Sequence, residues 1–445
     1  MNITADAMAA QVGGRTASTI ADEITALIEV GVLPQGERLP TIRSVATSLG
    51  VSVGTVAEAW SALRSRGLVE TRRRGGTTVV GATTGARPFA GWSNVDFLLS
   101  SPDVSLQPPL EAAFAHAVRQ PGVNAWGREH MIRELRDVAI ARWPFPAEAW
   151  TSAGGGTEGL WLATKAVIEP GRPIAVEEPA APGYLATLAE LGVRAIGVPV
   201  DDDGPSPDAL RAALAEGAAA FVHQPGGPYS TRHVLGEGRA EELAGLVEDS
   251  DAVVLEDDSL GPLSPVLVRT VGDRLPSRTI RVLSFCRAYG LDLRTSVVGG
   301  AQRLVERAIA ARSAGVASNS RILQHALAAL VRDPDAERVV DAARARYSAR
   351  TELAVRVFAE AGLAVHAGPG SHVIWVEVID EGAAALALAG RGVIVDVGRT
   401  SFVTRQETGL LRLSTAQLPE DPALVAELAS LVSRASHGDL RVAFD

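Results

Sequence analysis

The chain has 445 residues, which exceeds the size of a single compact core, so we expect two to four domains. Hydrophobic residues make up 47% and charged residues 21%, a mixture typical of globular proteins that argues against bulk disorder. The net charge of -10 is unevenly spread, because residues 1–80 hold eight Arg against seven acidic residues and the rest hold 34 basic against 45 acidic residues. The N-terminal fifth is therefore the only region whose net charge does not oppose binding to a polyanion such as DNA.

Counts of single residue types exclude several kinds of site. A single cysteine, Cys286, excludes a disulfide framework and a multi-cysteine metal site, and the eight histidines lack metal-binding spacing, so no metal is predicted. Lys165 is the only lysine, so no mechanism can use a lysine elsewhere. No apolar run approaches the roughly 20 residues that span a bilayer, and the start lacks the features of a signal peptide. We expect a cytoplasmic protein without a membrane partner.

The first segment predicts three short helices. Residues 16–30 place four apolar side chains at helical spacing. Thr41 is expected to cap a second helix that ends at Gly50, and Ser52 is expected to cap a third that is closed by Gly67. Two helices joined by so short a turn are typical of a helix-turn-helix.

Two strands are expected after the third helix, over residues 68–70 and 77–80, around an arginine-rich tip. A helix-turn-helix followed by such a wing is a DNA-binding arrangement, in which helix starts meet phosphates and arginine reaches base edges. The DNA-contact candidates are Thr41, Arg43, Ser52, Thr55, Arg72, Arg73 and Arg74. The alternative from the residues alone is a small helical dimerisation module whose arginines are solvated.

Residues 20–80 resemble the winged-helix domain of the GntR family of bacterial regulators. The resemblance rests on an LP-x-x-R block that ends at Arg43, a GVS-x-x-TV block over residues 50–56 and a GLVE block over residues 67–70. It implies that the partner is a duplex DNA operator. Val53 and Gly54 depart from the pattern, because many relatives carry polar or basic side chains there, so base readout by the third helix is expected to be thin.

The rest of the chain predicts a linker and an α/β region. Residues 82–95 are rich in Gly, Ala, Thr and Pro without periodicity, which favours a linker between a domain at 1–81 and one at 96–445. Apolar strand-like runs then alternate with Ala- and Leu-rich helices, which is typical of a mostly parallel sheet covered on both faces. From about residue 345 to 445, shorter units predict a smaller α/β subdomain.

Residues 154–159 satisfy the G-x-G-x-x-G pattern, with acidic Glu177 and Glu178 about 20 residues further on. A dinucleotide site is one interpretation. Residues 148–152 are a poor buried strand, however, and a glycine-rich turn that opens a helix binds any phosphate. The pattern therefore predicts a phosphate site without requiring NAD.

Residues 94–445 resemble the fold-type-I aminotransferase domain of MocR regulators, the GntR subfamily in which this domain senses an effector. Residues 155–157 match the family's phosphate cup, 177–179 its Glu-Asp-Pro turn and 223–228 its Asn-Pro-Thr-Gly-like segment. Further along, 256–259 match the Glu-Asp-Asp-Tyr segment, 284–287 with Arg294 match the Ser-Phe-Ser-Lys motif and its later arginine, and Arg412-Leu413 match the carboxylate-binding Arg-Leu. The ligand-site candidates that the resemblance implies are Gly155, Gly156, Thr157, Asp257, Ser284, Arg287, Arg294 and Arg412.

The sequence departs from this family at positions that the family uses to bind and react with its cofactor. Pyridoxal phosphate (PLP) needs a lysine amine for its Schiff base, and the aligned residue is Arg287, whose guanidinium stays protonated. Ser259 replaces the tyrosine near the ring hydroxyl, and Ala181 replaces the stacking aromatic. We therefore expect no covalent cofactor and no catalytic residue. The single cysteine, Cys286, is expected to be a buried structural thiol.

The sequence predicts a winged helix-turn-helix followed by an α/β, fold-type-I aminotransferase-like domain with a mostly parallel sheet. The expected function is a ligand-responsive, homodimeric transcription regulator whose emptied site holds a small anionic effector. Arg294 and Arg412 could instead be structural ion-pair partners, and Asp257 could cap a helix. The alternatives for the whole chain are a PLP enzyme fused to a DNA-binding domain and a regulator whose large domain is only a dimerisation scaffold.

Overall fold

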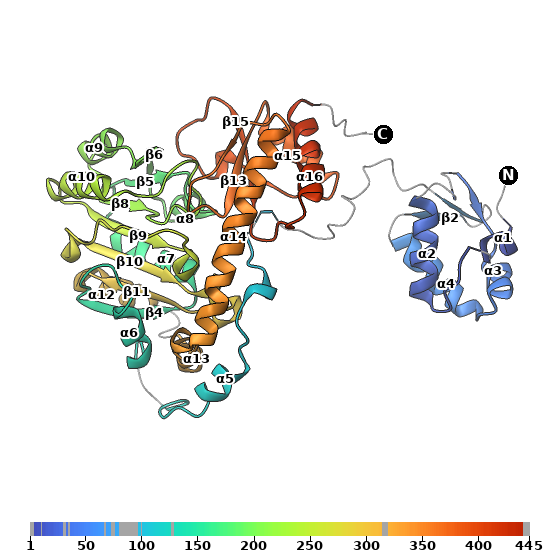
Figure 1. The fold of residues 1–445 in the computed structure, drawn as a ribbon, viewed down its shortest axis with the longest axis horizontal. Helices are drawn as coiled ribbons and strands as arrows, with labels where there is room; N and C mark the ends of the chain where they lie inside the picture. Colours follow the sequence, from blue (N-terminus) through green and yellow to red (C-terminus); the bar gives the residue numbers. More distant parts are fainter. Residues whose placement is uncertain are drawn as a thin grey trace. The chain divides into compact units, whose positions relative to one another are not determined.

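The computed structural model describes residues 4–9, 11–29, 33, 36–65, 68–72, 76–79, 97–98, 100–125, 129–313 and 319–438. The chain divides into two compact units, residues 1–91 and 92–440, each with its own core (Figure 1). The expected linker at 82–95 lies outside the described residues, as do the wing-tip candidates Arg73 and Arg74.

Helices α2 (Ala17–Glu29), α3 (Ile42–Leu49) and α4 (Val53–Ser65) build the first unit, as the apolar spacing predicts. Ile20 and Ile24 from α2 pack with Val56, Trp60 and Leu63 from α4 in one buried cluster. A further short helix, α1 (Ala5–Ala9), closes this core, although the sequence pattern did not predict it. Helices this short are not stable in isolation, so burial of one apolar face of each helix stabilises them.

The turn between α3 and α4 is fixed by local hydrogen bonds. Thr41 Oγ1 accepts from the Ser44 backbone nitrogen at 3.2 Å and caps α3, as expected. Gly50 follows with φ of 66°, a left-handed conformation that favours glycine and ends α3. Ser52 Oγ accepts from the Thr55 backbone nitrogen at 3.0 Å, which confirms the predicted start of α4. Local chemistry thus sets the angle at which α4 leaves α3.

The wing is a three-stranded antiparallel sheet of order β1-β3-β2 within the described part of the first unit. Strands β2 (Val69–Arg72) and β3 (Gly76–Val79) form the predicted hairpin. Strand β1 (Arg38–Leu39) precedes α3 and pairs with β3, so it ties the helix-turn-helix to the wing.

The second unit is built on a mixed sheet. Among the described residues it has eight strands in the order β4-β11-β10-β9-β8-β5-β6-β7, with β10, β9, β8, β5 and β6 mutually parallel. The strands are β4 (Ala149–Ala153), β5 (Ile174–Glu178), β6 (Ala195–Asp201), β7 (Gly204–Pro205), β8 (Ala220–His223), β9 (Val253–Asp258), β10 (Thr279–Ser284) and β11 (Ser296–Gly300). The expectation that residues 148–152 make a poor strand is wrong, because antiparallel pairing with β11 holds β4 in place.

Helices cover both faces of this sheet (Figure 1). Helices α7 (Gly156–Val167) and α12 (Gln302–Ser313) pack on one face, where Val176, Leu255 and Val282 point. Helices α9 (Pro207–Ala215) and α10 (Glu237–Glu248) pack on the other, against Phe221 and Val254. Alternate side chains of each strand thus enter opposite cores, which explains the continuous apolar runs of the sequence.

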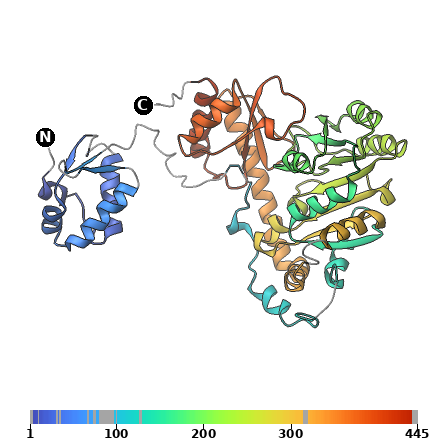
Figure 2. The ribbon, with the colours of Figure 1, turned by 180° about the vertical axis from the view of Figure 1, so that it is seen from behind.

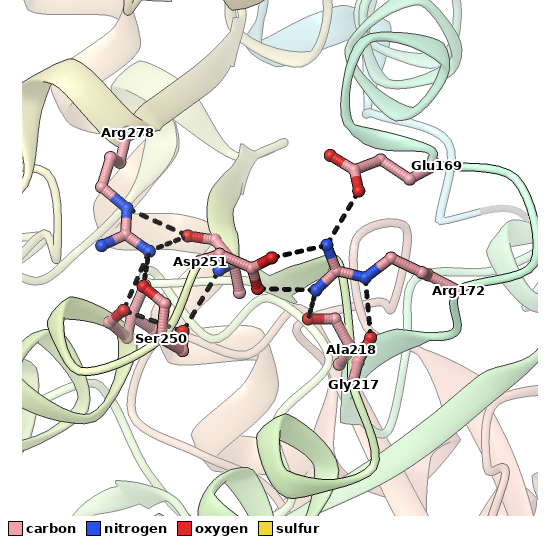
Figure 3. Close-up of polar contacts among 9 residues, drawn as sticks. Glu169, Arg172, Gly217, Ala218, Ser250, Asp251 and Arg278 are labelled. Carbon is pink, nitrogen blue, oxygen red and sulfur yellow. Dashed lines mark hydrogen bonds and ion pairs between the residues drawn. The ribbon is translucent and has the colours of Figure 1, made fainter.

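Arginine clamps hold the amino ends of the parallel strands (Figure 3). Arg172, which precedes β5, donates to the Gly217 carbonyl at 2.9 Å and reaches both carboxylate oxygens of Asp251 at 2.9 and 2.7 Å. Arg278, which precedes β10, donates to the Ser250 carbonyl at 2.7 Å. Segments that lead into β5, β8, β9 and β10 are therefore joined at one edge of the sheet.

A long helix, α14 (Pro334–Glu360), connects the large sheet to a smaller antiparallel sheet. In the described residues this second sheet has the order β12-β13-β15-β14, from β12 (Val365–His366), β13 (Val373–Val378), β14 (Asp396–Val397) and β15 (Gly409–Ser414). Figure 2 shows it grouped with α15 (Glu381–Ala389) and α16 (Pro422–Ser436) at one end of α14. These elements lie in the range where the sequence predicts a smaller subdomain.

The remaining helices complete the packing of the second unit. Helices α5 (Glu111–Ala117), α6 (Arg133–Ile140) and α13 (Arg321–Arg332) share a buried cluster with α14 and α11 (Cys286–Tyr289). The short 3-10 turns are η1 (Val104–Leu106), η2 (Gly261–Leu263), η3 (Pro276–Arg278), η4 (Leu291–Leu293) and η5 (Gly398–Thr400).

Candidate functional site

The helix starts of the first unit present the predicted contact residues. Thr41, Arg43 and Ser52 are exposed, and Thr55 is half-buried with its hydroxyl 2.8 Å from that of Ser52. Val53, at the first position of α4, is 49% exposed, so an apolar side chain occupies the outer surface of this helix start. The exposed start of α4 therefore offers hydroxyls, backbone N–H groups and an apolar side chain rather than basic groups.

The wing supplies the remaining DNA-contact candidates. Arg72 is the last residue of β2 and lies opposite Gly76 of β3, directly before the tip. Within the described wing, Thr71 and Thr77 join the two strands through hydroxyls 2.9 Å apart.

The second unit holds an open cavity of about 690 Å³ at the carboxyl end of its parallel strands. This edge, beside the start of a helix, is where open α/β sheets bind ligands. Seven of the eight ligand-site candidates line the cavity: Gly155, Gly156, Thr157, Asp257, Ser284, Arg287 and Arg294. Residues from four separate stretches of the chain are thus brought together as the resemblance implies.

The start of α7 carries the residues that the resemblance assigns to a phosphate cup, and this name is kept for them here. Gly155 has φ of 99°, and a Cβ atom on Gly156 would lie 3.0 Å from Ser284 Oγ, so glycine is needed for this close approach. Among the described residues, nothing accepts a hydrogen bond from the Arg294 guanidinium, which is exposed beside this turn. The first turn of α7, a hydroxyl and a free guanidinium therefore line the same part of the cavity, together with the Glu158 carboxylate, which accepts from the Gly154 N–H. Donors of this kind at a helix start favour an anion.

Asp257 lies at the end of β9 on the cavity floor, 4% exposed. Burial raises the pKa of its carboxyl to about 7, and the neighbouring Asp258 acts in the same direction, against the attraction of Arg287. Glu177, at the end of β5, is also buried, and burial raises its pKa to about 8. Both carboxyls also line a small pocket beside the cavity, so two groups with pKa values near neutrality lie next to each other there.

Arg287 lies on the short helix α11, three residues after Ser284, and is half-buried. Its Nη1 donates to the Ser100 carbonyl at 3.0 Å, and its Nη2 donates to Tyr229 Oη at 2.8 Å. The guanidinium is therefore held by two neutral acceptors and keeps further N–H groups for another partner.

Arg412, the eighth candidate, is not among the lining residues. It is buried in β15, where its Nη2 donates to Asp396 Oδ2 at 2.6 Å and to the Leu98 carbonyl at 3.0 Å. The guanidinium lies 5.7 Å from the ring centroid of Tyr229, which separates it from the cavity. Its Nε and Nη1 atoms find no partner in the described part of the chain, so it keeps donors for one more acceptor.

Tyr229 is a site residue that sequence reasoning missed. It lines the cavity, accepts from Arg287 and stacks under Arg412, while its carbonyl accepts from Trp375 Nε1 at 2.8 Å. Its position directly after the segment 223–228 was a signal that could have placed it near the site.

The lining residues do not fit a covalently held PLP. None of those that the structure describes is a lysine, and Lys165 lies on α7 with its amine 5.9 Å from the Trp161 ring. Ser259, at the position of the expected tyrosine, has a buried hydroxyl without a partner among the described residues. A guanidinium at position 287 cannot form the imine. The glycine turn and Ser284 line the cavity, whereas the positions that the resemblance assigns to the ring and its aldehyde hold Ser259 and Arg287.

Two further searches were confined to the described residues. They contain no group of three or more His, Cys, Asp or Glu side chains placed to hold a metal ion. Within the same residues, no helix is long and apolar enough to cross a membrane.

Both halves of the chain match known families. Residues 16–79 match the family described as bacterial regulatory proteins, gntR family, and residues 98–426 match aminotransferase class I and II. The second match spans most of the chain.

Known proteins share this two-part organisation. The vitamin B6 salvage pathway transcriptional repressor PtsJ of Salmonella typhimurium is 28% identical over 95% of this chain and 100% of its own length. The HTH-type transcriptional regulator TauR of Rhodobacter capsulatus is 25% identical over 93% of this chain and 94% of its own. The aspartate aminotransferase of Thermus thermophilus with maleate superposes with a TM-score of 0.66 and 21% identity, over 76% of this chain and 91% of that structure. The last likeness shows the fold of the large unit.

Proposed function

Because the chain belongs to the aminotransferase class I and II family and carries a GntR-family winged helix before it, as MocR-type regulators do, we propose that its large unit is a catalytically silent sensor. The full chain is a transcription regulator of the GntR type, in line with the names of its full-length relatives. The large unit would bind a small anionic effector and thereby change how the winged helices bind an operator in the cytoplasm.

The phosphate cup is the observation that carries this proposal. The start of α7, Ser284 and Arg294 offer donors that no described protein group uses, and an anion would satisfy them. Arg287 adds positive charge to the same wall. A phosphate or a carboxylate is therefore the chemical class we propose for the effector.

The silent character follows from the residue at position 287. Transamination needs an amine that condenses with an aldehyde, and this chain has only Lys165, which lies outside the cavity lining. The vitamin B6 link in the name of PtsJ makes PLP a compound to test here. Any PLP that bound this cavity would be held noncovalently, without its usual ring partners.

Homodimerisation is the third part of the proposal. The resemblance to fold-type-I aminotransferases implies a dimer, and a two-fold pair of winged helices would match two operator half-sites.

The test is calorimetric titration of the full-length chain with inorganic phosphate, PLP and maleate, paired with operator binding by DNA from its own promoter region. We expect at least one anion to bind and to change operator affinity. Arg294→Gln and Ser284→Ala should each weaken anion binding about tenfold, because each removes a donor to a charged acceptor.

Arg307→Gln is the matched control. Arg307 lies on α12 and donates to the Ile168 carbonyl, outside the cavity lining, so this variant should bind anions as the wild type does. Absence of binding by every anion, or equal affinity in the Arg294→Gln variant, would show that the cup is not an effector site.

A further inference from the structure

The first described stretch of the large unit is held mostly by residues of the small sheet and α14, and at one point by a side chain that lines the cavity. It consists of Phe97, Leu98 and Ser100–Asp103 and is called the tether here, because in the chain it directly follows the expected linker. It precedes the 3-10 turn η1, whose cap is the Asp103 side chain.

Most contacts of the tether come from the small sheet and α14. The Phe97 carbonyl accepts from the Ser414 backbone nitrogen at 2.9 Å, and the Leu98 carbonyl accepts from Arg412 at 3.0 Å. At the other end, Arg350 Nη2 lies 2.8 Å from Asp103 Oδ2. These partners hold the two ends of the tether without lining the cavity.

The middle of the tether is held from two sides, one of which is the cavity wall. Arg287, which lines the cavity, donates from Nη1 to the Ser100 carbonyl at 3.0 Å. Gln417, which does not line the cavity, donates from Nε2 to the Ser101 and Pro102 carbonyls at 3.2 and 3.4 Å. A charge on the cavity wall therefore has a neutral carbonyl of the tether as one of its two acceptors.

Ser100 is held in an unfavourable backbone conformation. Its φ is 50°, in the left-handed region that residues with a Cβ avoid, and it is 1% exposed. Its hydroxyl has no partner in the part of the chain that the structure describes. The Arg287 bond thus helps to hold a residue that would gain by relaxing.

We propose that an anion in the cavity competes with the tether for Arg287. A charged acceptor forms a stronger hydrogen bond to a guanidinium than a neutral carbonyl does. The unused N–H groups of Arg287 can meet an anion first, and an anion in the cup would then turn the planar guanidinium toward itself and away from the Ser100 carbonyl. Ser100 would then leave its left-handed conformation. Effector binding is thereby coupled to release of the tether.

This inference rests on the proposed function and adds the step that links the cavity to the DNA-binding unit. The tether is the part of the sensor closest in sequence to the winged helix, so its release changes the restraint on the connection between the two units. Effector affinity and operator affinity would then be reciprocally linked.

The experiment is hydrogen exchange of the full-length chain, read on the peptide that spans Phe97–Leu106, with and without saturating inorganic phosphate. In the wild type, phosphate should speed exchange about tenfold. Arg287→Gln should exchange at the fast rate without phosphate, and its operator affinity should equal that of the phosphate-saturated wild type. Arg344→Gln is the matched control. Arg344 donates to the Pro262 carbonyl, and neither residue belongs to the tether or lines the cavity.

Ser100→Gly provides a second variant that keeps the carbonyl and removes the left-handed penalty. In this variant the amides of the tether should stay protected from exchange at the phosphate concentration at which the tether is released in half of the wild-type molecules. Two results would contradict the proposed release of the tether and leave the proposed function standing. One is slow exchange of this peptide in Arg287→Gln without phosphate. The other is unchanged exchange in wild-type protein that calorimetry shows to have bound phosphate. A cavity that binds no anion in calorimetry would overturn both.

Discussion

Arg287 retains the positive charge of the lysine that the family resemblance places there, but its chemistry differs. A guanidinium cannot act as the nucleophile that forms an imine, whereas it can donate several hydrogen bonds in one plane. In this structure those bonds go to the Ser100 carbonyl and to Tyr229. Arg287 therefore makes a structural contact at the position where the resemblance implies an imine-forming lysine.

Arg287→Lys should restore imine formation with PLP. We expect the variant to give a visible absorption band with PLP, and borohydride reduction followed by peptide mass spectrometry should place the adduct on residue 287. The wild type should give no adduct in the cavity. Arg294→Lys is the control, because it introduces the same amine on the same cavity wall at another position. An adduct on both variants, or on neither, would mean that position 287 no longer faces the aldehyde.

Asp257→Asn should change the pH dependence of stability. Burial raises the pKa of Asp257 from 3.8 to about 7, so the folded state holds the proton that the unfolded state releases. The stabilising contribution of the protonated carboxyl is complete below pH 3.8 and is lost as the pH rises to about 7. The variant should therefore become more stable relative to the wild type across this window, by on the order of 4 kcal/mol.

Chemical denaturation at several pH values between 4 and 8.5 measures this difference. Glu177 titrates in the same range, so the comparison of the two proteins is the measurement, rather than either curve alone. A difference that stays constant with pH would show that Asp257 is ionised throughout in the folded chain.

At the scale of elements, the turn between α3 and α4 sets what the first unit can present to DNA. Arg43 is exposed on the first turn of α3, while the start of α4 carries Val53 and Gly54. Arg43→Ala should cost about 1–3 kcal/mol of operator binding if this arginine reads a guanine, with a smaller loss on random duplex. Fluorescence anisotropy at two salt concentrations measures both affinities.

Arg64→Ala is the control for this variant. Arg64 is exposed in the last turn of α4, at the opposite end of that helix from Ser52 and Thr55. We expect its loss to leave the preference for operator over random duplex unchanged. Equal losses of preference in both variants would assign Arg43 to general charge attraction.

Elements with local signals could be predicted from the sequence. The caps at Thr41 and Ser52 were predicted because each depends on one hydroxyl and a backbone nitrogen three residues later. Strand β1 was not predicted, because Arg38 and Leu39 become a strand only by pairing with β3. The same holds for β4, which lacks a strong apolar run and depends on β11.

The candidate site shows the same limit. Seven ligand candidates meet because motifs that follow parallel strands come together at one sheet edge. The Asp396 partner of Arg412 and the contact between Arg287 and Ser100 join residues far apart in the chain, so no local pattern announces them. Tyr229 was missed for the same reason, since its role depends on both arginines.

At the scale of the whole molecule, charge separates the two units. Residues 1–80 carry a balance of +1, and residues 81–445 carry 34 basic and 45 acidic residues, a balance of -11. The field of the large unit therefore opposes association with duplex DNA, and the first unit must supply the attraction. This distribution favours contact with DNA through the winged helix alone.

The arginine clamps at the amino ends of the parallel strands have a consequence for how this protein can change. Arg172 and Arg278 fasten the segments that lead into four strands at the edge opposite the cavity. Substitutions at the carboxyl edge then alter the ligand site without loosening the register of the sheet. The chemistry of the cavity can therefore be changed, by nature or in the laboratory, at a few lining residues while the sheet keeps its framework.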